Sequence, residues 1–302
     1  MASFQGHQLE HYADAQLSRF IREAPSLQHH EGILLLSDTH VAKRYAADRA
    51  EDANEAIELA CRLGVRAPAI KRTVEVDDIT WCIMDKVAGV TLEEAWSELG
   101  LLKSIVLALQ LRAFIGILRS ATSSTAGSLA TGMCRSFWLE DRYRLPARAT
   151  MNNIHAFINF WMDFVSLRRE IRKTASQHRE LPKHHHLSPA SGLVFTHHDL
   201  APRNILLHPS GDLWLLDWDY AGWYPVCFEF AAMHNFNIPR KWNRWARIRW
   251  NLFCWIAAGF YGRDARVLRI VQSRCARFPA ARRFNIKANG YASAIGRRSD
   301  SS

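Results

Sequence analysis

The first part of the chain alternates short apolar runs with polar turns, a pattern typical of β-hairpins. Residues 32–45, GILLLSDTHVAKRY, contain two strand-forming runs joined at Ser37-Asp38-Thr39. The runs RTVEV and TWCIMD flank Asp77-Asp78 in the same way. Between the hairpins, EDANEAIELACRLGV places apolar residues at helical spacing and ends at Gly64. We therefore predict a small β-rich unit with one helix, spanning residues 1–87.

The rest of the chain has mostly helical spacing. Thr91 and Glu94 are spaced as a capping box at the start of a long apolar segment. Residues 155–180 and 241–262 carry apolar and aromatic residues three and four positions apart. The short runs NILL and LWLL predict a hairpin about the turn Pro209-Ser210-Gly211-Asp212. We predict a mainly helical unit over residues 88–302, with a disordered tail from Gly290, and hence an α+β fold in two lobes.

The composition is that of a globular protein with a basic surface. The 302 residues are 48% hydrophobic, which is enough to bury a sizeable core. The 39 basic and 29 acidic residues give a net charge of +10, which favours anionic partners. Six cysteines without CxxC spacing favour neither a zinc site nor a disulfide framework, and we expect a reducing, cytoplasmic setting.

Neither the N-terminus nor the apolar helical stretches indicate a membrane protein. The N-terminus has no basic region followed by an apolar run, so we expect no secretory signal. Asn251–Gly262, taken as the most apolar helical stretch, is well short of the roughly twenty residues that cross a bilayer. We therefore expect no membrane partner.

Two conspicuous stretches have ordinary explanations. Three consecutive histidines, His184-His185-His186, cannot easily converge on one metal ion from a loop, so we interpret them as a solvated segment. Residues 240–250, RKWNRWARIRW, resemble a nucleic-acid surface in composition. Trp242, Trp245 and Trp250 have spacing compatible with one helix face, however, which favours a core helix with a basic exposed side. We expect no nucleic-acid partner.

The segment FTHHDLAPRNILL, residues 195–207, places polar side chains between two apolar ends. Asp199 and Asn204 bracket its loop, and Asp217 follows the next predicted strand. If the two strands pair through their turn, Asn204 and Asp217 come to the same end. Carboxylate and amide oxygens suit a hard divalent cation such as Mg²⁺. Asp199 would then lie near the metal, free to accept a proton or to orient a hydroxyl.

These motifs resemble a known family. HHDLAPRN, residues 197–204, matches the HxDxxxxN catalytic loop of the aminoglycoside phosphotransferase and choline kinase-like families, relatives of the protein kinases. LDWD, residues 216–219, resembles their metal-binding segment, while HVAKRY, NEAIEL and CIMDKVAGVTLEEAW resemble their lysine strand, paired helix and hinge. The resemblance covers about residues 32–262 and is closest to the fungal branch. It implies a two-lobed protein kinase-like fold.

The resemblance also implies a role for each site residue. Lys43 would contact the α- and β-phosphates of ATP or GTP, and Glu55 would hold it in place. The hinge residues Met84, Asp85 and Lys86 would meet the base through backbone atoms. Asn204 and Asp217 would hold Mg²⁺, and Asp199 would be the catalytic base or aligning group. His197 would shape the loop.

Several assignments stay open in the sequence. No GxGxxG precedes Lys43, so the loop that covers the phosphates is unassigned. Glu51 or Glu58 could replace Glu55 as the partner of the lysine. Asp219 could cap the following turn or add a charge near the metal, and we favour the cap. Arg203 and Glu229 are a candidate ion pair, by analogy with kinases.

The predicted function is Mg²⁺-assisted transfer of the γ-phosphoryl group of ATP or GTP to a hydroxyl of a small molecule, by a monomer. A catalytically inactive nucleotide-binding protein is the alternative. A protein kinase fits less well, because only a short segment separates Asp217 from the helix at Glu229. Residues 230–262 contain no acidic residue, so we expect a neutral or anionic acceptor, chosen by residues 120–190 and 230–262.

Overall fold

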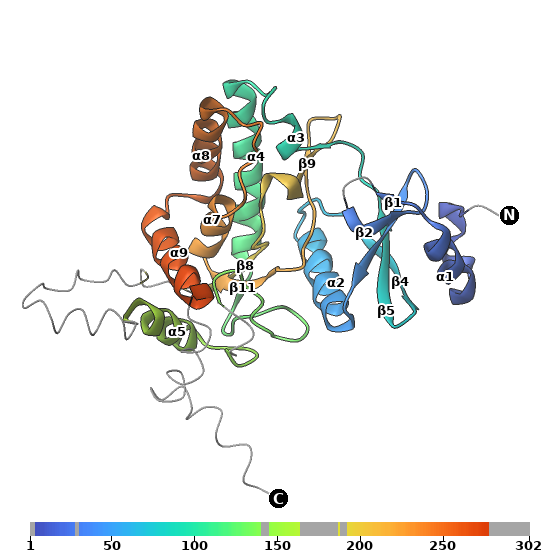
Figure 1. The fold of residues 1–302 in the computed structure, drawn as a ribbon, viewed down its shortest axis with the longest axis horizontal. Coiled ribbons are helices and arrows are strands. Elements are labelled where there is room, and N and C mark those ends of the chain that lie inside the picture. Colours follow the sequence, from blue (N-terminus) through green and yellow to red (C-terminus); the bar gives the residue numbers. More distant parts are fainter. Residues whose placement is uncertain (1–3, 28–29, 140–144, 164–186, 188–191, 278–302) are drawn as a thin grey trace, which may run out of the picture.

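The structure is a computed structural model that describes residues 4–27, 30–139, 145–163, 187 and 192–277. The chain forms a smaller lobe around one β-sheet and a larger, mainly helical lobe (Figure 1). This arrangement confirms the expected α+β fold in two lobes. His184–His186, the later part of the predicted helix at 155–180 and the predicted tail lie outside the described residues.

The first lobe is a five-stranded antiparallel sheet with helices on both faces. The strand order is β1-β2-β3-β5-β4. Its elements in chain order are η1 (Gly6–His11), α1 (Asp14–Glu23), β1 (Ser26–Leu27), β2 (His30–Leu35), β3 (His40–Tyr45), α2 (Ala47–Arg62), β4 (Ile70–Val76) and β5 (Ile79–Asp85).

The predicted hairpins form, and turn chemistry explains them. β2 pairs with β3, and β4 pairs with β5, both antiparallel. Asp77 and Asp78 both have positive φ, 53° and 59°, which the two central residues of a type I′ turn require. The helix α2 begins at Ala47, before the predicted start. The sequence does not mark this start, because the N-cap Ala46 has no capping side chain.

Alternation along β3 places Lys43 on the face of the sheet toward α2. Ala42 and Ile83 pack on the opposite face, against η1 and α1. Val41 and Tyr45 pack with Ala50 and Ala53 of α2. Lys43 lies between Val41 and Tyr45 in the sequence, so it shares their face. The helices η1 and α1 were not predicted from the sequence, and they cover the face that the lysine does not use.

The second lobe is built around the long helix α4. Its elements are β6 (Val90–Thr91), α3 (Leu92–Ala95), α4 (Leu101–Ser120), β7 (Thr122–Ser123), α5 (Met151–Asp163), β8 (Leu193–Thr196), η3 (Pro202–Asn204), β9 (Ile205–Leu207), β10 (Leu213–Leu215), β11 (Gly222–Pro225), α7 (Cys227–His234), α8 (Arg244–Ala258) and α9 (Gly262–Arg277). Two small antiparallel sheets, β10-β9-β6 and β11-β8-β7, lie beside the helices.

Two local predictions for this lobe are confirmed. Thr91 caps α3: its Oγ1 accepts a hydrogen bond from the Glu94 N–H, and Glu94 Oε2 accepts one from the Thr91 N–H. β9 and β10 form the predicted hairpin, with Leu207 opposite Leu213. Asn204 directly precedes β9, so one end of this hairpin adjoins the loop of residues 197–204.

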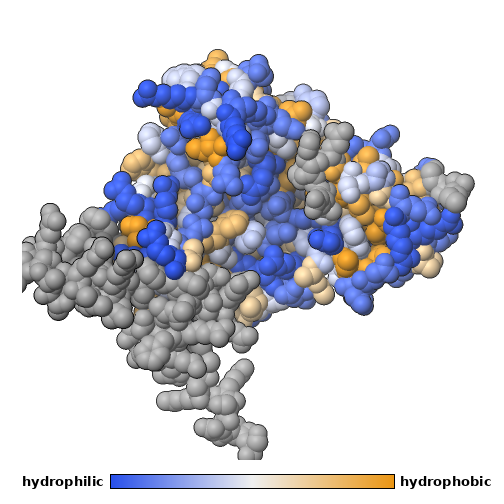
Figure 2. All heavy atoms as spheres, viewed as in Figure 1, coloured by the Kyte–Doolittle hydropathy of each residue, from blue (hydrophilic) through white to orange (hydrophobic). Residues whose placement is uncertain are grey.

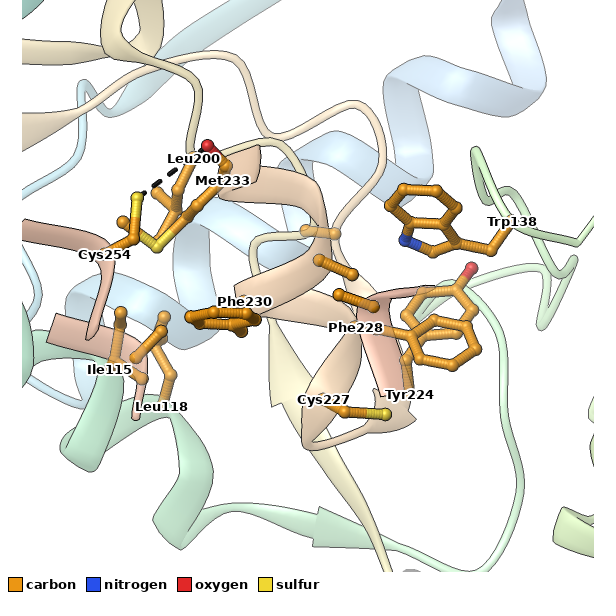
Figure 3. Close-up of a cluster of buried hydrophobic side chains, with 14 of the residues drawn as sticks. Ile115, Leu118, Trp138, Leu200, Tyr224, Cys227, Phe228, Phe230, Met233 and Cys254 are labelled. Atoms are coloured by element: carbon orange, nitrogen blue, oxygen red, sulfur yellow. Dashed lines mark hydrogen bonds between the residues drawn. The ribbon is translucent and has the colours of Figure 1, made fainter. Parts of the chain in front are cut away.

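One large apolar cluster fills the second lobe. Figure 3 shows Phe230 of α7 beside Ile115 and Leu118 of α4, with Phe228 and Tyr224 on the other side of α7. Phe228, Phe230 and Tyr224 are all buried. Burial of such aromatic side chains contributes on the order of 2–3 kcal/mol each. It fixes α7 beside the loop of residues 197–204.

The predicted single face of tryptophans in α8 is wrong for one of them. Trp242 and Trp250 are buried and pack against Trp96, whereas Trp245 is 55% exposed. Trp242 lies before the first turn of α8, so it does not follow the spacing of the helix. The helix side that Trp245 shares with Ile248 points away from the core.

The helix α4 also corrects the expectation about apolar stretches. It has 20 residues and a hydropathy of 1.9, so by length and composition alone it could cross a membrane, which Asn251–Gly262 could not. In the fold it is a core helix, with Leu107, Leu111 and Leu118 among its buried residues. Its length and composition are therefore weak evidence for a membrane span.

Candidate active site

Lys43 joins the two lobes through two carboxylates. Its Nζ lies 2.6 Å from Asp217 Oδ1 and 2.7 Å from Asp219 Oδ1. Asp217 follows β10 with a φ of 64°, a conformation uncommon outside glycine and typical of constrained functional turns. The strand β3 and the end of the β9–β10 hairpin thus meet at the lysine.

The electrostatics of this group favour a charged lysine. Burial opposes its charge, but Asp217, Tyr45 and Asp219 together raise the pKa of Lys43. Burial also opposes ionisation of Asp217, and the Lys43 charge outweighs it, so the pKa of Asp217 is lowered. Burial and the neighbouring Asp217 charge raise the pKa of Asp219. Asp219 is therefore a member of the lysine site, and the expectation that it only caps a turn is wrong.

Glu55 does not fill the role that the resemblance implied. It lies on the exposed side of α2, as do Glu51 and Glu58. Within the described residues, Lys43 forms its ion pairs with Asp217 and Asp219 and none with Glu55. The prediction that Glu55 holds the lysine is therefore corrected: the residues that follow β10 satisfy its charge.

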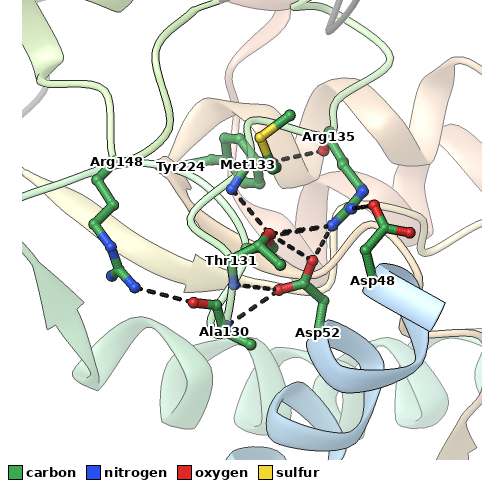
Figure 4. Close-up of polar contacts among 9 residues, drawn as sticks. Asp48, Asp52, Ala130, Thr131, Met133, Arg135, Arg148 and Tyr224 are labelled. Atoms are coloured by element: carbon green, nitrogen blue, oxygen red, sulfur yellow. Dashed lines mark hydrogen bonds and ion pairs between the residues drawn. The ribbon is translucent and has the colours of Figure 1, made fainter.

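The buried acidic residue of α2 is Asp52, and it faces the second lobe (Figure 4). Asp52 Oδ1 accepts hydrogen bonds from the N–H groups of Ala130 and Thr131, at 3.1 and 2.9 Å. Asp52 Oδ2 accepts from Thr131 Oγ1 and from Arg135. Arg135 also pairs with Asp48 at 2.6 Å. We call this group the Asp52–Arg135 cluster; no sequence motif indicated it.

The loop of residues 197–204 holds the Asp199 carboxylate with two donors. Asp199 Oδ2 accepts from Arg203 Nη2 at 2.7 Å and from Asn204 Nδ2 at 2.9 Å. Asn204 Nδ2 also donates to the Asp199 carbonyl at 2.9 Å. Burial raises the pKa of Asp199 to about 6, against the Arg203 charge, and the Asp217 charge adds to the rise. The carboxylates of Asp199 and Asp217 are therefore close enough for their charges to interact.

Glu229 of α7 stabilises the loop of residues 197–204 through hydrogen bonds with its backbone. Its two carboxylate oxygens accept from the N–H groups of His197 and His198, at 2.7 and 3.0 Å. Its carboxylate is buried, which raises the pKa of Glu229 to about 7. Arg203 pairs with Asp199, so the candidate Arg203–Glu229 ion pair is wrong.

Both histidines are structural. His197 Nε2 bonds the Leu216 carbonyl at 2.9 Å, which joins the loop of residues 197–204 to the end of β10; this agrees with its expected role in shaping the loop. His198 has a φ of 66° and its Nε2 bonds Ser136 Oγ at 2.8 Å. Burial lowers the pKa of His197 to about 4 and that of His198 to about 3. Both rings are neutral at neutral pH.

The oxygen donors expected for Mg²⁺ come from neighbouring positions across the hairpin. The Leu216 N–H donates to the Asn204 carbonyl at 2.8 Å, so Asp217 follows directly after a residue bonded to Asn204. Among the described residues, no group of three histidine, cysteine or acidic side chains forms a closed metal site. An aspartate and an asparagine fit Mg²⁺, which keeps waters and substrate phosphates as its other ligands.

The expected hinge lies at the end of β5. Met84 is buried on the lysine face of the sheet. The Lys86 N–H donates to the Thr39 carbonyl at 2.8 Å, and Asp85 pairs with Lys71 at 3.0 Å. Contacts of Met84, Asp85 and Lys86 with a base stay predictions. A cavity of about 550 Å³ is lined by Asp219 together with Arg44, Tyr45, Ala46, Arg49, Asp78 and Ile79.

Comparison with protein families decides where the chain belongs. The model described as "Phosphotransferase enzyme family" matches residues 34–268. The chain belongs to this phosphotransferase family. The expected family and enzyme class, a phosphotransferase, are confirmed; the fungal branch stays a prediction. The match covers both lobes, including Lys43 and Asp217.

Several solved structures are similar to this chain at low sequence identity. Aminoglycoside phosphotransferase APH(3'')-Id from Streptomyces rimosus, solved with ADP and streptomycin, is 14% identical, with a TM-score of 0.48. The alignment covers 87% of this chain and 98% of that one. Choline kinase LicA from Streptococcus pneumoniae is 13% identical, with a TM-score of 0.43, over 96% of this chain and 98% of that one. No curated protein sequence matches the chain.

Proposed function

We propose that the protein transfers the γ-phosphoryl group of ATP or GTP to a hydroxyl of a small molecule, with Mg²⁺. The observation that supports this most is the meeting of Lys43 with Asp217, beside the loop that carries Asp199 and Asn204. Phosphoryl transfer needs mainly positioning and neutralisation of charge. A cationic lysine, oxygen ligands and a buried carboxylate are the groups for those tasks.

In this proposal Lys43 binds the phosphates of the nucleotide. Its ammonium lies between two carboxylates, so its position is fixed before any ligand binds. A nucleotide phosphate would share the ammonium with Asp217 and Asp219. Because the lysine side chain is only 16% exposed, its interaction with phosphate is less screened by water than that of a surface lysine.

Asn204 and Asp217 are the residues that would hold Mg²⁺. The amide nitrogen of Asn204 is engaged with Asp199, so its ligand atom would be Oδ1. When bound, the ion would neutralise phosphate charge and help to orient the phosphates. Asp219 is a second carboxylate at the same lysine, 20% exposed, and would add negative charge to the site.

Asp199 is the proposed base. The oxygen of the acceptor forms a bond to the γ-phosphorus, the bond to the nucleoside diphosphate breaks, and the hydroxyl proton passes to the Asp199 carboxylate. Arg203 and Asn204 both donate to Oδ2, which leaves Oδ1 to face the acceptor. With a pKa of about 6, Asp199 is ionised at neutral pH and close to the pH at which a base works best.

We propose a neutral or anionic acceptor. The segment 230–262 lacks acidic residues, and Arg203, which is 45% exposed, stands beside Asp199. A polycationic acceptor would meet a guanidinium there instead of a carboxylate cluster. Recognition of a carboxylate or phosphate on the acceptor by Arg203 would have the bidentate geometry that guanidinium favours.

A consumption screen tests the proposed function. Purified protein, MgATP or MgGTP and a panel of hydroxylated metabolites are incubated, and nucleoside diphosphate formation is measured. Asp199→Asn serves as the isosteric blank, with its thermal midpoint checked. We expect turnover with a neutral or anionic acceptor that falls about 10²- to 10⁴-fold in the variant. Thermal stabilisation by nucleotide, with no turnover on any acceptor, would favour the inactive nucleotide-binding alternative.

A further inference from the structure

Two helices of the second lobe leave a row of large apolar side chains exposed. On α4 these are Leu102, Val106 and Leu109, and on α8 they are Trp245, Ile248 and Trp255. Their exposed fractions run from 45% for Trp255 to 77% for Leu102. Isolated apolar side chains are normal on a surface, but a contiguous group marks an interaction site. Figure 2 shows apolar surface between hydrophilic side chains over this part of the molecule.

The spacing places each set on the side of its helix opposite to the core. Leu102, Val106 and Leu109 are at positions i, i+4 and i+7, one face of an α-helix. The buried residues Leu107 and Leu111 lie on the other face. Trp245, Ile248 and Trp255 are at i, i+3 and i+10, again one face, opposite to the buried Trp250 and Phe253.

The two exposed faces lie on the same side of the helix pair. Arg249 of α8 donates to Ser104 at 3.0 Å, and Arg112 of α4 donates to the carbonyl of Ile256 at 3.0 Å. These bonds join the helices near their beginnings and again further along, so the helices run side by side in the same direction (Figure 1). Because both helices also bury their inner faces in one cluster, the outer faces form one surface, the α4–α8 face.

Charge decides which partner this surface suits. Neither α4 nor α8 contains an aspartate or glutamate. Lys103, Arg244 and Arg247 are exposed and, within the described part of the chain, form no ion pair. The nearest acidic residue before α4 is Glu98. A second copy of this face would bring like charges together, whereas an anionic partner would neutralise them.

We propose that the α4–α8 face docks the protein on an anionic phospholipid surface. Exposed tryptophans and leucines beside arginines are the composition of helices that lie in the membrane interface, where indole rings sit at the head-group level and basic side chains meet lipid phosphates. The face comes from the outer sides of two helices, which suits a broad lipid surface better than an inserted peptide. The proposal departs from the sequence-based expectation of no membrane partner, and it does not depend on the proposed reaction.

Vesicle sedimentation tests the proposal. The full chain is mixed with vesicles of phosphatidylcholine alone or with phosphatidylglycerol added, and the bound fraction is measured. We expect binding to the anionic vesicles that weakens as salt is added. Each basic residue near an anionic surface raises the partition coefficient about fivefold. Arg244→Glu with Arg247→Glu should therefore lower it at least about tenfold. Leu102→Glu, at a highly exposed position, should lower it as well.

A matched control separates this face from net charge. Arg19→Glu with Arg62→Glu changes the net charge equally, at exposed arginines of the first lobe, and should leave most of the binding intact. Equal losses in both double variants would overturn the proposal, as would failure of the wild-type chain to bind anionic vesicles. A dimer in solution that Leu102→Glu dissociates, or binding to polyglutamate but not to vesicles, would instead assign the face to a second copy or to an acidic protein.

Discussion

At the scale of single residues, the Asp199 carboxylate depends on its neighbours for its position. Arg203 is the only charged donor to it among the described residues, at 2.7 Å. Removal of a charge-assisted hydrogen bond typically costs about 1.5–3 kcal/mol. Arg203→Ala should therefore lower kcat about 10- to 100-fold. Because Arg203 is partly exposed, the thermal midpoint should stay nearly unchanged.

Steady-state kinetics and thermal unfolding of Arg203→Ala, with Arg203→Lys as the conservative variant, check this prediction. Lysine keeps the charge but loses the planar geometry, so an intermediate rate is expected. A variant with full activity at saturating acceptor would contradict the role of Arg203 in positioning Asp199.

The partner of Lys43 is a second question that one side chain decides. Asp219→Asn removes a carboxylate 2.7 Å from the ammonium, whereas Glu55→Gln changes an exposed position. Asp219 helps to hold the Lys43 ammonium in place, and a hydrogen bond to a charged group contributes about 1.5–3 kcal/mol. We therefore expect Asp219→Asn to lower kcat/KM for the nucleotide about tenfold or more and Glu55→Gln to leave it unchanged. The opposite order of effects would restore the assignment that the family resemblance implied.

Residue types and spacing revealed much of this site but not its pairings. Lys43, Asp199, Asn204 and Asp217 could be predicted because they belong to spaced motifs. The role of Asp219 could not, since it depends on how β3 meets the end of β10 in three dimensions. Glu229 was paired with the wrong group for the same reason: its partners are backbone N–H groups, which no sequence pattern marks.

At the scale of elements, the Asp52–Arg135 cluster ties α2 of the first lobe to the segment that precedes residue 136 of the second. Asp52 and Arg135 are both about 5% exposed or less. Removing one member of a buried ion pair typically destabilises a protein by about 3–5 kcal/mol, because the other charge is left unpaired. Arg135→Ala should therefore lower the free energy of unfolding by about that amount.

Denaturant unfolding measures this effect, and Arg62→Ala is the matched control. Arg62 pairs with Glu58 on the exposed side of the same helix, where an ion pair contributes about 0.5 kcal/mol or less. If Arg135→Ala and Arg62→Ala destabilised the protein equally, the cluster would not be a structural link between the lobes.

Elements with strong local signals were predictable, and weakly marked ones were not. The hairpins β2–β3, β4–β5 and β9–β10 have turn residues that specify them. The helix α1 has no side-chain N-cap hydrogen bond, and β6 and β7 have only two residues each, too few for a periodic pattern. The short strands exist because neighbouring strands pair with them.

At the scale of the whole molecule, a partly buried histidine, His234, makes stability depend on pH. Burial, and then the charge of Arg269, lowers the pKa of His234 to about 4, below its unfolded value of about 6.5. Between these values the unfolded chain binds more protons than the folded one, so acid favours unfolding. The contribution is therefore full above about pH 6.5 and is lost as the pH falls toward 4.

His234→Gln isolates this contribution. The difference in free energy of unfolding between the wild type and the variant should decline between about pH 6.5 and 4, by at most about 1.4 kcal/mol per pH unit. Urea unfolding at a series of pH values measures it. A difference that stays constant over this interval would mean that the ring is protonated equally in both states.

The fold class and the enzyme class of the whole chain followed from the sequence because the motifs span both lobes. The surface of α4 and α8 did not, since the burial of Trp242 and exposure of Trp245 arise from where α8 begins. The acceptor pocket also depends on packing between elements. Arg203 and the lack of acidic residues in 230–262 are the features that favour a neutral or anionic acceptor.

The most direct test of the central claim is to follow the γ-phosphorus itself. ³¹P NMR of the wild type with MgATP and an accepted hydroxyl compound should show the γ-resonance replaced by a phosphate monoester resonance, together with ADP. The same reaction with Asp199→Asn should proceed about 10²- to 10⁴-fold more slowly. Loss of the γ-resonance to inorganic phosphate alone, or an equal rate of ester formation in Asp199→Asn, would contradict it.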